Sequence, residues 1–439
     1  MQGITFTQNT PLYEFAQDFL VGGVGAAGRF NGSLGHPAYF ERGDGAYLWG
    51  VDGHRYLDFN LSHGATILGH NHPALRRAVE KVLDMGLICG CETEYTARLA
   101  QQICEIIPCA ERVRYLPSGT EVTLVALRLA RALTQRPKVL KFEGHFHGMH
   151  ELIYYGPRHI LTDEVRFSKG TPLTAGVPEE FGDFVTIVPW NDAAAFDQAV
   201  DREGSEIAAV IMEPVCYNSG CIPADPGFLA HVREVTARQG IVLIFDEILS
   251  GFRTGVDCMQ GYYGITPDLC TLAKAVANGV PIAILAGKTG IMDELAPLGA
   301  VSQSGTYSGH QFGVLAALAT LEELGQPSFY PHIRALADRL YDGLNQLFAK
   351  HGLPGRVQGL GARFGIYFGI DKPVHNYQEA VKLDTEMMHR FVRDCFQRDI
   401  YFQTIGHAIG HSGLSGAHSL EDVDWAMEQF DAVLAGMVR

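Results

Sequence analysis

Short apolar runs alternate with amphipathic segments along most of the chain, from about residue 70 to residue 325. Strands joined by helices form βαβ units, so we expect a mostly parallel, seven-stranded sheet covered by helices. The runs 208–212 and 241–245 are apolar at every position, which is typical of strands buried on both faces. The pattern predicts helices over 73–85, 94–107, 120–134, 192–202, 226–239 and 310–324, and strands over 112–116, 137–142, 184–189, 207–212, 241–246, 269–272 and 282–287.

The two ends of the chain follow a different pattern. Residues 47–59 predict a hairpin in which Asp52-Gly53 forms a type I′ turn. Beyond about residue 325, two long amphipathic segments (328–351 and 377–398) predict helices around a strand at Phe364–Phe368. We therefore expect a large α/β domain and a smaller α+β domain: an N-terminal segment and hairpin that join the small domain (1–59), the large domain (60–325) and the C-terminal part of the small domain (326–439).

Composition narrows the class of protein. The 439 residues carry 34 Lys and Arg against 49 Asp and Glu, a net charge of −15, which argues against a nucleic-acid partner. No apolar run is long enough for a membrane span, and residues 1–5 lack the basic head of a signal peptide, so we expect a soluble cytoplasmic protein. The nine cysteines include no CxxC pair, and we expect most to be buried free thiols.

Polar residues that follow apolar strands are the first candidates for chemistry, because ligands of parallel sheets bind at the carboxyl ends of the strands. Ser118, Gly119 and Thr120 follow the strand 112–116 and begin a helix, so their hydroxyl and N–H groups could bind a phosphate. Ser118 with Glu121 also fits a capping box, which needs no ligand. Both interpretations stay open at this point.

A carboxylate and a lysine follow two later strands. Asp246 and Glu247 come after five apolar residues, and a buried acid at a strand end is costly without a basic partner. Lys274 stands alone in an apolar stretch, 28 residues after Asp246. A buried lysine loses its charge readily and becomes a nucleophile that can form a Schiff base, although a surface lysine would also fit the segment.

Three histidines lie together in Gly144–His150. His145 and His147 could ligate a metal, as in a metal hydrolase, but no carboxylate ligand lies nearby in the sequence. The aromatic ring of Phe146, between them, could instead form a flat wall for a planar ligand.

A phosphate site, a flat wall, an acid at a strand end and a lysine together suit a planar phosphorylated aldehyde, pyridoxal 5′-phosphate (PLP). With this set, the chain resembles the class III aminotransferases of PLP fold type I, within them the glutamate-1-semialdehyde aminomutase-like branch. The resemblance extends from Gly22-Gly23-Val24 to Ser415–His418. Its most specific segments are Ser118–Glu121, Gly144–Gly148, Glu213-Pro214, Phe245–Arg253, Lys274–Pro281 and Gly305–Gly309.

The resemblance implies roles for the residues around the cofactor. Lys274 would hold PLP as an internal aldimine and later carry the Cα proton. Asp246 would pair with the pyridine nitrogen and keep it protonated, while Phe146 and Ile248 would pack on the two faces of the ring. Ser118, Gly119 and Thr120 would bind the phosphate, Glu213 would support the site from behind, and Thr306 would reach the phosphate of the neighbouring subunit in a homodimer.

The resemblance also implies where the substrate binds. Arg29 occupies the position at which aminomutase-like enzymes hold a carboxylate, although a solvated arginine is the plain alternative. His63, in Ser62-His63-Gly64, replaces the tryptophan usual in the aminomutase. Phe146 stands where many members have tyrosine, Gly309-His310-Gln311 replaces a frequent Gly-Asn-Pro, and Gly50 replaces an aspartate.

These departures favour a transaminase with its own substrate. We expect a PLP-dependent aminotransferase that moves an amino group from an amino acid or amine to a keto or aldehyde acceptor by a ping-pong mechanism. The partners would be small molecules bearing a carboxylate, with no nucleic acid, membrane or metal. An intramolecular 1,2-aminomutase is the alternative within the family and a racemase is a weaker one. Outside the family, the alternatives are a metal hydrolase built on His145 and His147 and a non-catalytic scaffold.

Overall fold

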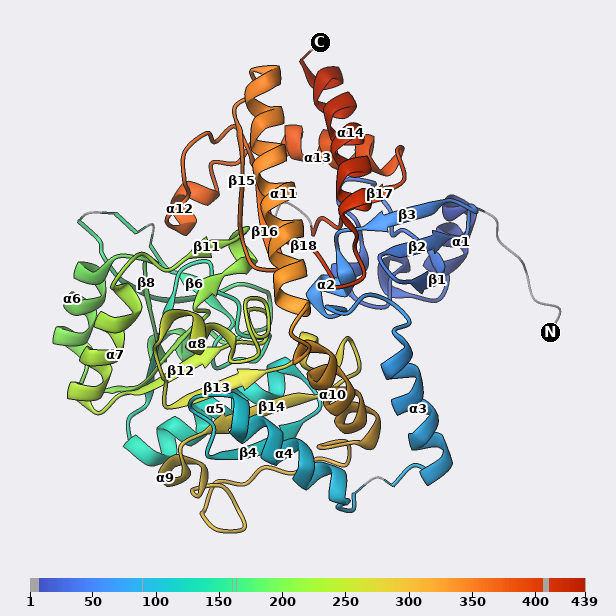
Figure 1. Ribbon diagram of the computed structural model, residues 1–439. Helices are drawn as coiled ribbons and strands as arrows, with labels where there is room; N and C mark the ends of the chain where they lie inside the picture. The colour runs from blue at the N-terminus through green and yellow to red at the C-terminus, as the bar shows by residue number, and fades with distance from the viewer. Residues whose placement is uncertain (1–7, 89, 160, 163, 406–409, 439) are drawn as a thin grey trace.

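A large β-sheet lies at the centre of the molecule (Figure 1). The computed structural model describes residues 8–88, 90–159, 161–162, 164–405 and 410–438. Within these residues the central sheet has nine strands. In spatial order they are β4 (Arg112–Leu116), β14 (Ala283–Gly287), β13 (Leu269–Leu272), β12 (Val242–Asp246), β9 (Ile207–Met212), β5 (Lys138–Phe142), β8 (Val185–Val188), β7 (Ser168–Pro172) and β6 (Tyr155–Pro157).

The seven strands expected from the sequence are all present in this sheet. β13, β12, β9, β5 and β8 are parallel, and β14 runs antiparallel to both β13 and β4. The predicted number of strands is too low, because β7 and β6 extend one edge in antiparallel pairs. These two strands carry Gly156, Pro157, Gly170 and Pro172 rather than an apolar run, so the hydrophobic pattern does not mark them.

Helices cover both faces of the sheet, as the unbroken apolar runs predict. In β9, Ala209 and Ile211 belong to the apolar cluster that contains α5, whereas Val210 and Met212 belong to the cluster that contains Phe228 of α7. The helices of this region are α3 (Pro73–Met85), α4 (Glu94–Ile106), α5 (Gly119–Thr134), α6 (Ala193–Glu203), α7 (Phe228–Gln239), α8 (Cys258–Tyr263), α9 (Thr289–Met292) and α10 (Gln311–Leu324).

The two ends of the chain meet in one sheet. β3 pairs in parallel with β17, so that Leu57 lies opposite Ile400. The long helices α11 and α14 lie side by side next to this region (Figure 1). Its elements are α1 (Asn9–Gln17), β1 (Phe40–Asp44), β2 (Tyr47–Gly50), β3 (Arg55–Asp58), α2 (Leu61–Gly64), α11 (Phe329–His351), β15 (Gly355–Leu360), β16 (Arg363–Phe368), α12 (Tyr377–Ala380), α13 (Thr385–Phe396), β17 (Ile400–Tyr401), β18 (Ser412–Gly413) and α14 (Leu420–Met437); the short pair β10 (Val215–Cys216) and β11 (Ile222–Pro223) belongs to the large region.

Two local predictions in this region are wrong. The hairpin forms, but its turn is not type I′: Gly53 has a φ of 85°, whereas Asp52 is not in the left-handed region. The carboxylate of Asp52 instead accepts a hydrogen bond from the N–H of His54 (3.1 Å), which holds a longer connection. The predicted helix 377–398 is two helices, because Asp384 caps a new one by accepting from the N–H of Met387 (3.0 Å).

The cysteines agree with the prediction from composition. The eight in the described part of the chain are all free, and six of them are buried, while Cys89 lies outside the described residues. Burial raises the pKa of thiols such as Cys221 and Cys395, so they act as small apolar side chains. None of the described helices combines the length and the apolar composition that a membrane span requires.

Candidate active site

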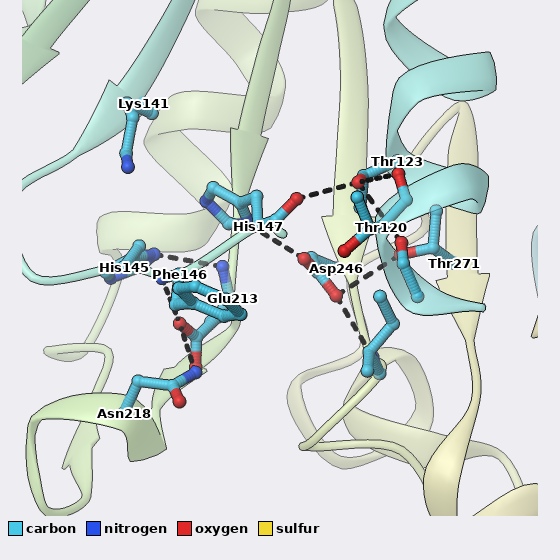
Figure 2. Close-up of polar contacts among 12 residues, drawn as sticks. Thr120, Thr123, Lys141, His145, Phe146, His147, Glu213, Asn218, Asp246 and Thr271 are labelled. Carbon is cyan, nitrogen blue, oxygen red and sulfur yellow. Dashed lines mark hydrogen bonds and ion pairs between the residues drawn. The ribbon is translucent and has the colours of Figure 1, made fainter. Parts of the chain in front are cut away.

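The carboxylate of Asp246 lies buried at the carboxyl end of β12. Oδ1 accepts hydrogen bonds from the N–H of Ile248 (3.1 Å) and from the hydroxyl of Thr271 (3.2 Å), and Oδ2 lies 2.7 Å from Nδ1 of His147. Figure 2 shows the carboxylate between His147 and Thr271. Burial raises the pKa of Asp246 to about 7, although the bonds from Ile248 and Thr271 and the charge on Lys274 oppose the change. The site therefore holds an acid that a cationic partner would ionise.

Lys274 is separated from the end of β13 by one residue, lies at the start of a short 3-10 helix, and adopts a left-handed backbone conformation (φ 48°). A non-glycine residue in this conformation is strained, and such strain concentrates at functional sites. Burial lowers the pKa of its ammonium to about 8, although the carboxylates of Asp246 and Glu213 oppose the change. About a tenth of the ε-amine is therefore neutral and nucleophilic at pH 7, far more than for an ordinary lysine.

Asp246 and Lys274 line one cavity of about 310 Å³. Ser118, Gly119 and Thr120 line the same cavity at the N-terminus of α5, the 16-residue helix that packs under the sheet. Ser118 caps this helix, because its hydroxyl accepts from the N–H of Glu121 (3.3 Å). The side chain of Glu121 contacts the same hydroxyl (3.3 Å), not the reciprocal backbone N–H of a capping box. The cap thus leaves the positive end of the helix open to the cavity.

Two glycines keep this end of the cavity clear of side chains. A Cβ on Gly119 would lie 3.0 Å from Cδ1 of Ile248, and one on Gly148 would lie 2.9 Å from Cα of Thr120. Gly148 also needs its positive φ of 96°. The backbone can therefore approach a bound group closely here.

Phe146 and Ile248 both line the cavity that contains Lys274. Phe146 is 42% exposed, so it is accessible to a ligand, and its ring forms a T-shaped pair with Tyr154 at a centroid distance of 6.2 Å. The backbone N–H of Phe146 donates to Oε1 of Glu213 (2.8 Å), which fixes the loop that carries the ring.

Glu213 is buried behind this loop and forms hydrogen bonds with the loop and with Asn218. Oε1 also accepts from the side-chain amide of Asn218 (2.9 Å), and its backbone N–H donates to Nδ1 of His145 (3.0 Å). Burial raises the pKa of Glu213 to about 7. The second carboxylate oxygen of Glu213 has no hydrogen-bond partner among the described residues.

His145 and His147 do not form a metal site in the described part of the chain, where no three His, Cys, Asp or Glu side chains converge. Nδ1 of His147 is bonded to Asp246, and Nδ1 of His145 is bonded to the backbone of Glu213. Burial places the pKa of both rings well below the ordinary value, so both are neutral. The geometry of the two rings favours support of the loop over metal binding.

A second cavity, of about 520 Å³, adjoins the first, and Phe146 and Asn218 line both. One part of its wall is apolar, with Tyr154, Leu173 and Ile405, and another part carries His63 and His411. Burial, together with the charges of Lys274 and Arg363, lowers the pKa of His63 to about 4. The imidazoles on this wall are therefore neutral hydrogen-bonding groups.

An unusual backbone segment presents His63 to this cavity. Four successive residues, Leu61–Gly64, have positive φ values between 54° and 82°. Two fully buried arginines hold the segment from behind. Arg253 donates to the carbonyl of Gly64, and Arg363 donates to the carbonyl of Asn60 (3.4 Å).

Two predicted residues line neither of these cavities in the single chain. Arg29 is exposed, with its guanidinium next to Gly25, and lines neither of them. Thr306 is exposed beside Tyr307 and lines a different hollow. The structure therefore brings together Ser118, Gly119, Thr120, Phe146, Glu213, Asp246, Ile248 and Lys274, places His63 next to them, and leaves Arg29 and Thr306 apart.

Four residues of the site were not assigned these positions by the sequence analysis. Thr271 is polar within the apolar run of β13, and Asn218 follows the Glu213-Pro214 turn, so each carried a weak signal. His147 was considered only as a metal ligand. Arg363 begins the apolar run of β16 and could have been noticed in the same way as Lys274, as a lone cation in an apolar stretch.

Comparisons with known proteins agree with this geometry. A family model described as aminotransferase class-III matches residues 31–409. The chain is 39% identical over 430 residues to the glutamate-1-semialdehyde 2,1-aminomutase of Nitrosospira multiformis, a match that covers 98% of this chain and 99% of that protein.

Solved structures show the same fold. An omega-transaminase from Sphaerobacter thermophilus superposes with a TM-score of 0.91 at 30% identity, covering 98% of this chain and 97% of that one. The FumI protein of Sphingopyxis sp. MTA144, in a PLP internal aldimine form, superposes with a TM-score of 0.85 at 25% identity, covering 99% and 97%.

The fold and the site therefore define an enzyme of PLP fold type I. The chain belongs to the class III aminotransferase family, within which its similarity includes a glutamate-1-semialdehyde aminomutase. PLP is the cofactor. The residues present fit it: a buried acid at Asp246, an amine of lowered pKa at Lys274, and a helix N-terminus kept open by Gly119 and Gly148 surround one cavity.

Proposed function

We propose that this enzyme is an aminotransferase, which takes an amino group from an amino acid or amine and passes it to a keto or aldehyde acceptor in two half-reactions. The observation that carries the proposal is the second cavity, of about 520 Å³, which adjoins the cavity of Lys274. In such a reaction the first product leaves before the acceptor enters. A wide adjoining cavity gives both molecules access to the same amine.

When bound, PLP supplies a carbonyl carbon that amines attack and a ring that accepts the electron pair left at the substrate's α-carbon. Lys274 would hold the cofactor through Nζ and, once released, move the α-proton at that same nitrogen. Its lowered pKa supports this role, because a general base works best with a pKa close to the working pH.

Asp246 would bind the ring nitrogen of the cofactor and hold a proton on it. His147 and Thr271 orient the carboxylate for this task, since they bond to different oxygens of it. A cation close to Asp246 also lowers the pKa that burial has raised, so the pair would be ionised together.

The remaining residues of the cavity would position the cofactor. Ser118, Gly119 and Thr120 would bind its phosphate at the N-terminus of α5. Phe146 and Ile248 would enclose its ring, and Asn218 lies on the wall of the same cavity with a polar amide group. Glu213 fixes both the loop of Phe146 and the side chain of Asn218.

An intramolecular aminomutase is the second candidate, and the 39% identity to a glutamate-1-semialdehyde 2,1-aminomutase supports it. A single-turnover experiment separates the two. The holoenzyme is mixed with an amino donor alone while its visible absorbance and the released keto compound are measured. An aminotransferase releases one keto product per site and then stops until an acceptor is added. Repeated conversion of the donor to an isomer, with no keto product, would establish the aminomutase.

We also propose that the enzyme is a homodimer in the cytoplasm in which Thr306 completes the neighbouring site. Exposure of Thr306 and Tyr307, away from the cavity of Lys274, supports a partner outside the single chain. Mixing inactive Lys274→Ala chains with inactive Thr306→Arg chains should restore activity, because one site of each mixed dimer is then intact. No recovery in mixed dimers whose formation is verified would place Thr306 outside the site.

A further inference from the structure

The cation of Arg363 is buried beside the second cavity, and no carboxylate of the residues that the structure describes is bonded to it. The side chain is fully buried, and in the described part of the chain Nε has no hydrogen-bond partner. Among the described residues, its terminal nitrogens contact only uncharged groups: the carbonyls of Asn60 (3.4 Å) and His411 (3.0 Å) and Nδ1 of His411. Burying an unpaired charge is costly, so such a residue usually has an anionic partner in the working state of a protein.

The acids around Arg363 do not provide that partner. Asp58 is near enough to influence it, but Oδ1 accepts from the N–H groups of Asn60 and Leu61, and Oδ2 bonds to His70. Residues 406–409, shortly before His411 in the sequence, are Gly-His-Ala-Ile and include no acid. The second buried cation, Arg253, bonds only to the carbonyls of Leu249 and Gly64 among the described residues.

Arg363 acts on the cavity through two imidazoles. His411 contacts its guanidinium directly and lines the cavity, and His63 lines the same wall and feels the charges of both Arg363 and Lys274. Burial and the neighbouring cations keep both rings neutral, so they can donate hydrogen bonds without competing for a charge. The wall therefore presents the neutral imidazoles of His63 and His411 to the cavity, with the cation of Arg363 behind them.

We propose that Arg363 is a specificity-determining positioning residue, which makes the His63–His411 wall the binding place for a carboxylate of the amine substrate. The inference rests on the proposed amino-group transfer and names its substrate class: amines that bear a carboxylate. It assigns to Arg363 the recognition that the family resemblance assigns to Arg29, whose side chain is exposed outside both cavities.

The test compares donors that differ only in the carboxylate. Alanine is paired with isopropylamine, and 3-aminobutanoate with 2-aminobutane, so that a methyl group replaces the carboxylate at two spacings from the amine. The rate of the first half-reaction is measured with the holoenzyme and with Arg363→Met. For the better carboxylate donor, kcat/KM should fall about 10–100-fold, mainly through KM. The two imidazoles lose the cation that positions them, and a hydrogen bond to a charged group is worth about this much. The paired amine should change by less than about threefold.

Two further variants separate recognition from folding. Arg363→Lys keeps the charge and should recover most of the preference for the carboxylate donor. His63→Phe alters the wall without removing a buried cation, and it should lose the same preference to a smaller extent. Each variant is first checked for wild-type secondary structure and PLP absorbance.

Binding of butanoate to the holoenzyme gives a readout that does not depend on turnover. Calorimetry should show weaker binding in Arg363→Met and recovery in Arg363→Lys. An equal loss of both donors in a pair, or a selective loss in Arg29→Ala but not in Arg363→Met, would overturn the inference. If wild-type enzyme converts none of the four donors, the proposed transfer fails, while the butanoate measurement still decides the role of Arg363.

Discussion

The two sides of the reaction cavity carry opposite charge and achieve it differently. On the side of β12 and β9, Asp246 and Glu213 are buried acids, and most of their oxygens accept hydrogen bonds from side chains or backbone. On the side of β16, Arg363 and Arg253 are buried cations that bond only to uncharged groups in the described structure. Burial raises the pKa of the two acids and lowers the pKa of the two arginines.

Lys274 lies under the influence of both sides. The acids raise the pKa of its ammonium and the two arginines lower it, on top of the larger effect of burial. The difference between the sides matches the charges of the proposed ligands, because the cofactor ring is cationic and a substrate carboxylate is anionic. Substitutions of Lys274, of the acids, of the arginines or of Gly148 should therefore change activity, stability and PLP binding by different amounts.

The largest effect is expected from Lys274→Ala, which removes the group that both sides act on. Amino-group transfer should fall by at least about 10⁴-fold, because both covalent attachment and proton transfer are lost. Borohydride reduction of the holoenzyme followed by mass spectrometry should show covalent PLP in the wild type and none in the variant. Lys288→Ala, a surface lysine paired with Asp268, is the matched control and should keep wild-type activity. Covalent PLP in Lys274→Ala would place the attachment elsewhere.

The next effect comes from the acidic side. Asp246→Asn keeps the shape of the side chain but cannot hold a proton on the cofactor ring, so kcat should fall about 10²–10³-fold. Steady-state kinetics at saturating PLP measure the loss. Asp268→Asn, at the opposite end of the same sheet, is the control and should stay within about threefold of the wild type. Equal activity of the two variants would contradict the role given to Asp246.

The same aspartate should make the stability of the apoenzyme depend on pH. Its folded pKa of about 7 lies above the ordinary value, so the folded state binds more protons than the unfolded state between about pH 4 and 7. This contribution is fully present below pH 4 and is lost as the pH rises through 7. Urea unfolding should show that Asp246→Asn removes about 1–3 kcal/mol of this decline. An unchanged pH profile would show that the carboxylate is not shifted.

A smaller effect is expected at Gly148, one of the two glycines at the end of the cavity where the phosphate would bind. Gly148→Ala strains a φ of 96° and brings a methyl group to 2.9 Å from Cα of Thr120, so it should cost about 3 kcal/mol and weaken PLP binding. Gly176→Ala is matched in backbone strain (φ 89°) but has open space, and should cost about 1 kcal/mol with unchanged PLP affinity. Thermal unfolding and PLP titration measure both. Equal PLP affinity in the two variants would show that Gly148 does not lie against the cofactor.

The smallest effect is a shift in the titration of Lys274 in the apoenzyme. Only the neutral amine reacts with added PLP, so the rate of imine formation should rise with pH around a midpoint near 8. Asp246→Asn should lower the midpoint and Arg363→Met should raise it, each by roughly one unit. Stopped-flow absorbance across pH 6 to 10 provides the measurement. If both variants shift the midpoint in the same direction, the two sides of the cavity do not act oppositely on Lys274.

Much of the fold follows from hydrophobic periodicity. The strands and helices of the large region were predicted within a few residues because each is buried by a continuous or amphipathic apolar pattern. The edge strands β6 and β7 were missed, since backbone pairing rather than burial of an apolar run holds them. The break before Asp384 was missed because a helix cap interrupts a pattern that continues on either side.

The cofactor side of the site was more predictable than the substrate side. Asp246 ends an apolar strand, and Lys274 and Ser118–Thr120 come shortly after two others, so topology alone places them at one edge of the sheet. Arg363 and His411 belong to the C-terminal part of the chain and reach the cavity only through the packing of one region on the other. No local pattern records that packing, and Arg29 was favoured there on resemblance alone.

The pairing of β3 with β17 bears on how the chain is made. Leu57 lies opposite Ile400, so the edge of β3 has no partner until the ribosome has added more than three hundred further residues. At synthesis rates of roughly 5–20 residues per second, that interval is tens of seconds. An open strand edge can pair with other chains during this time. The nascent protein is thus expected to depend on chaperones more than an enzyme whose first sheet closes early.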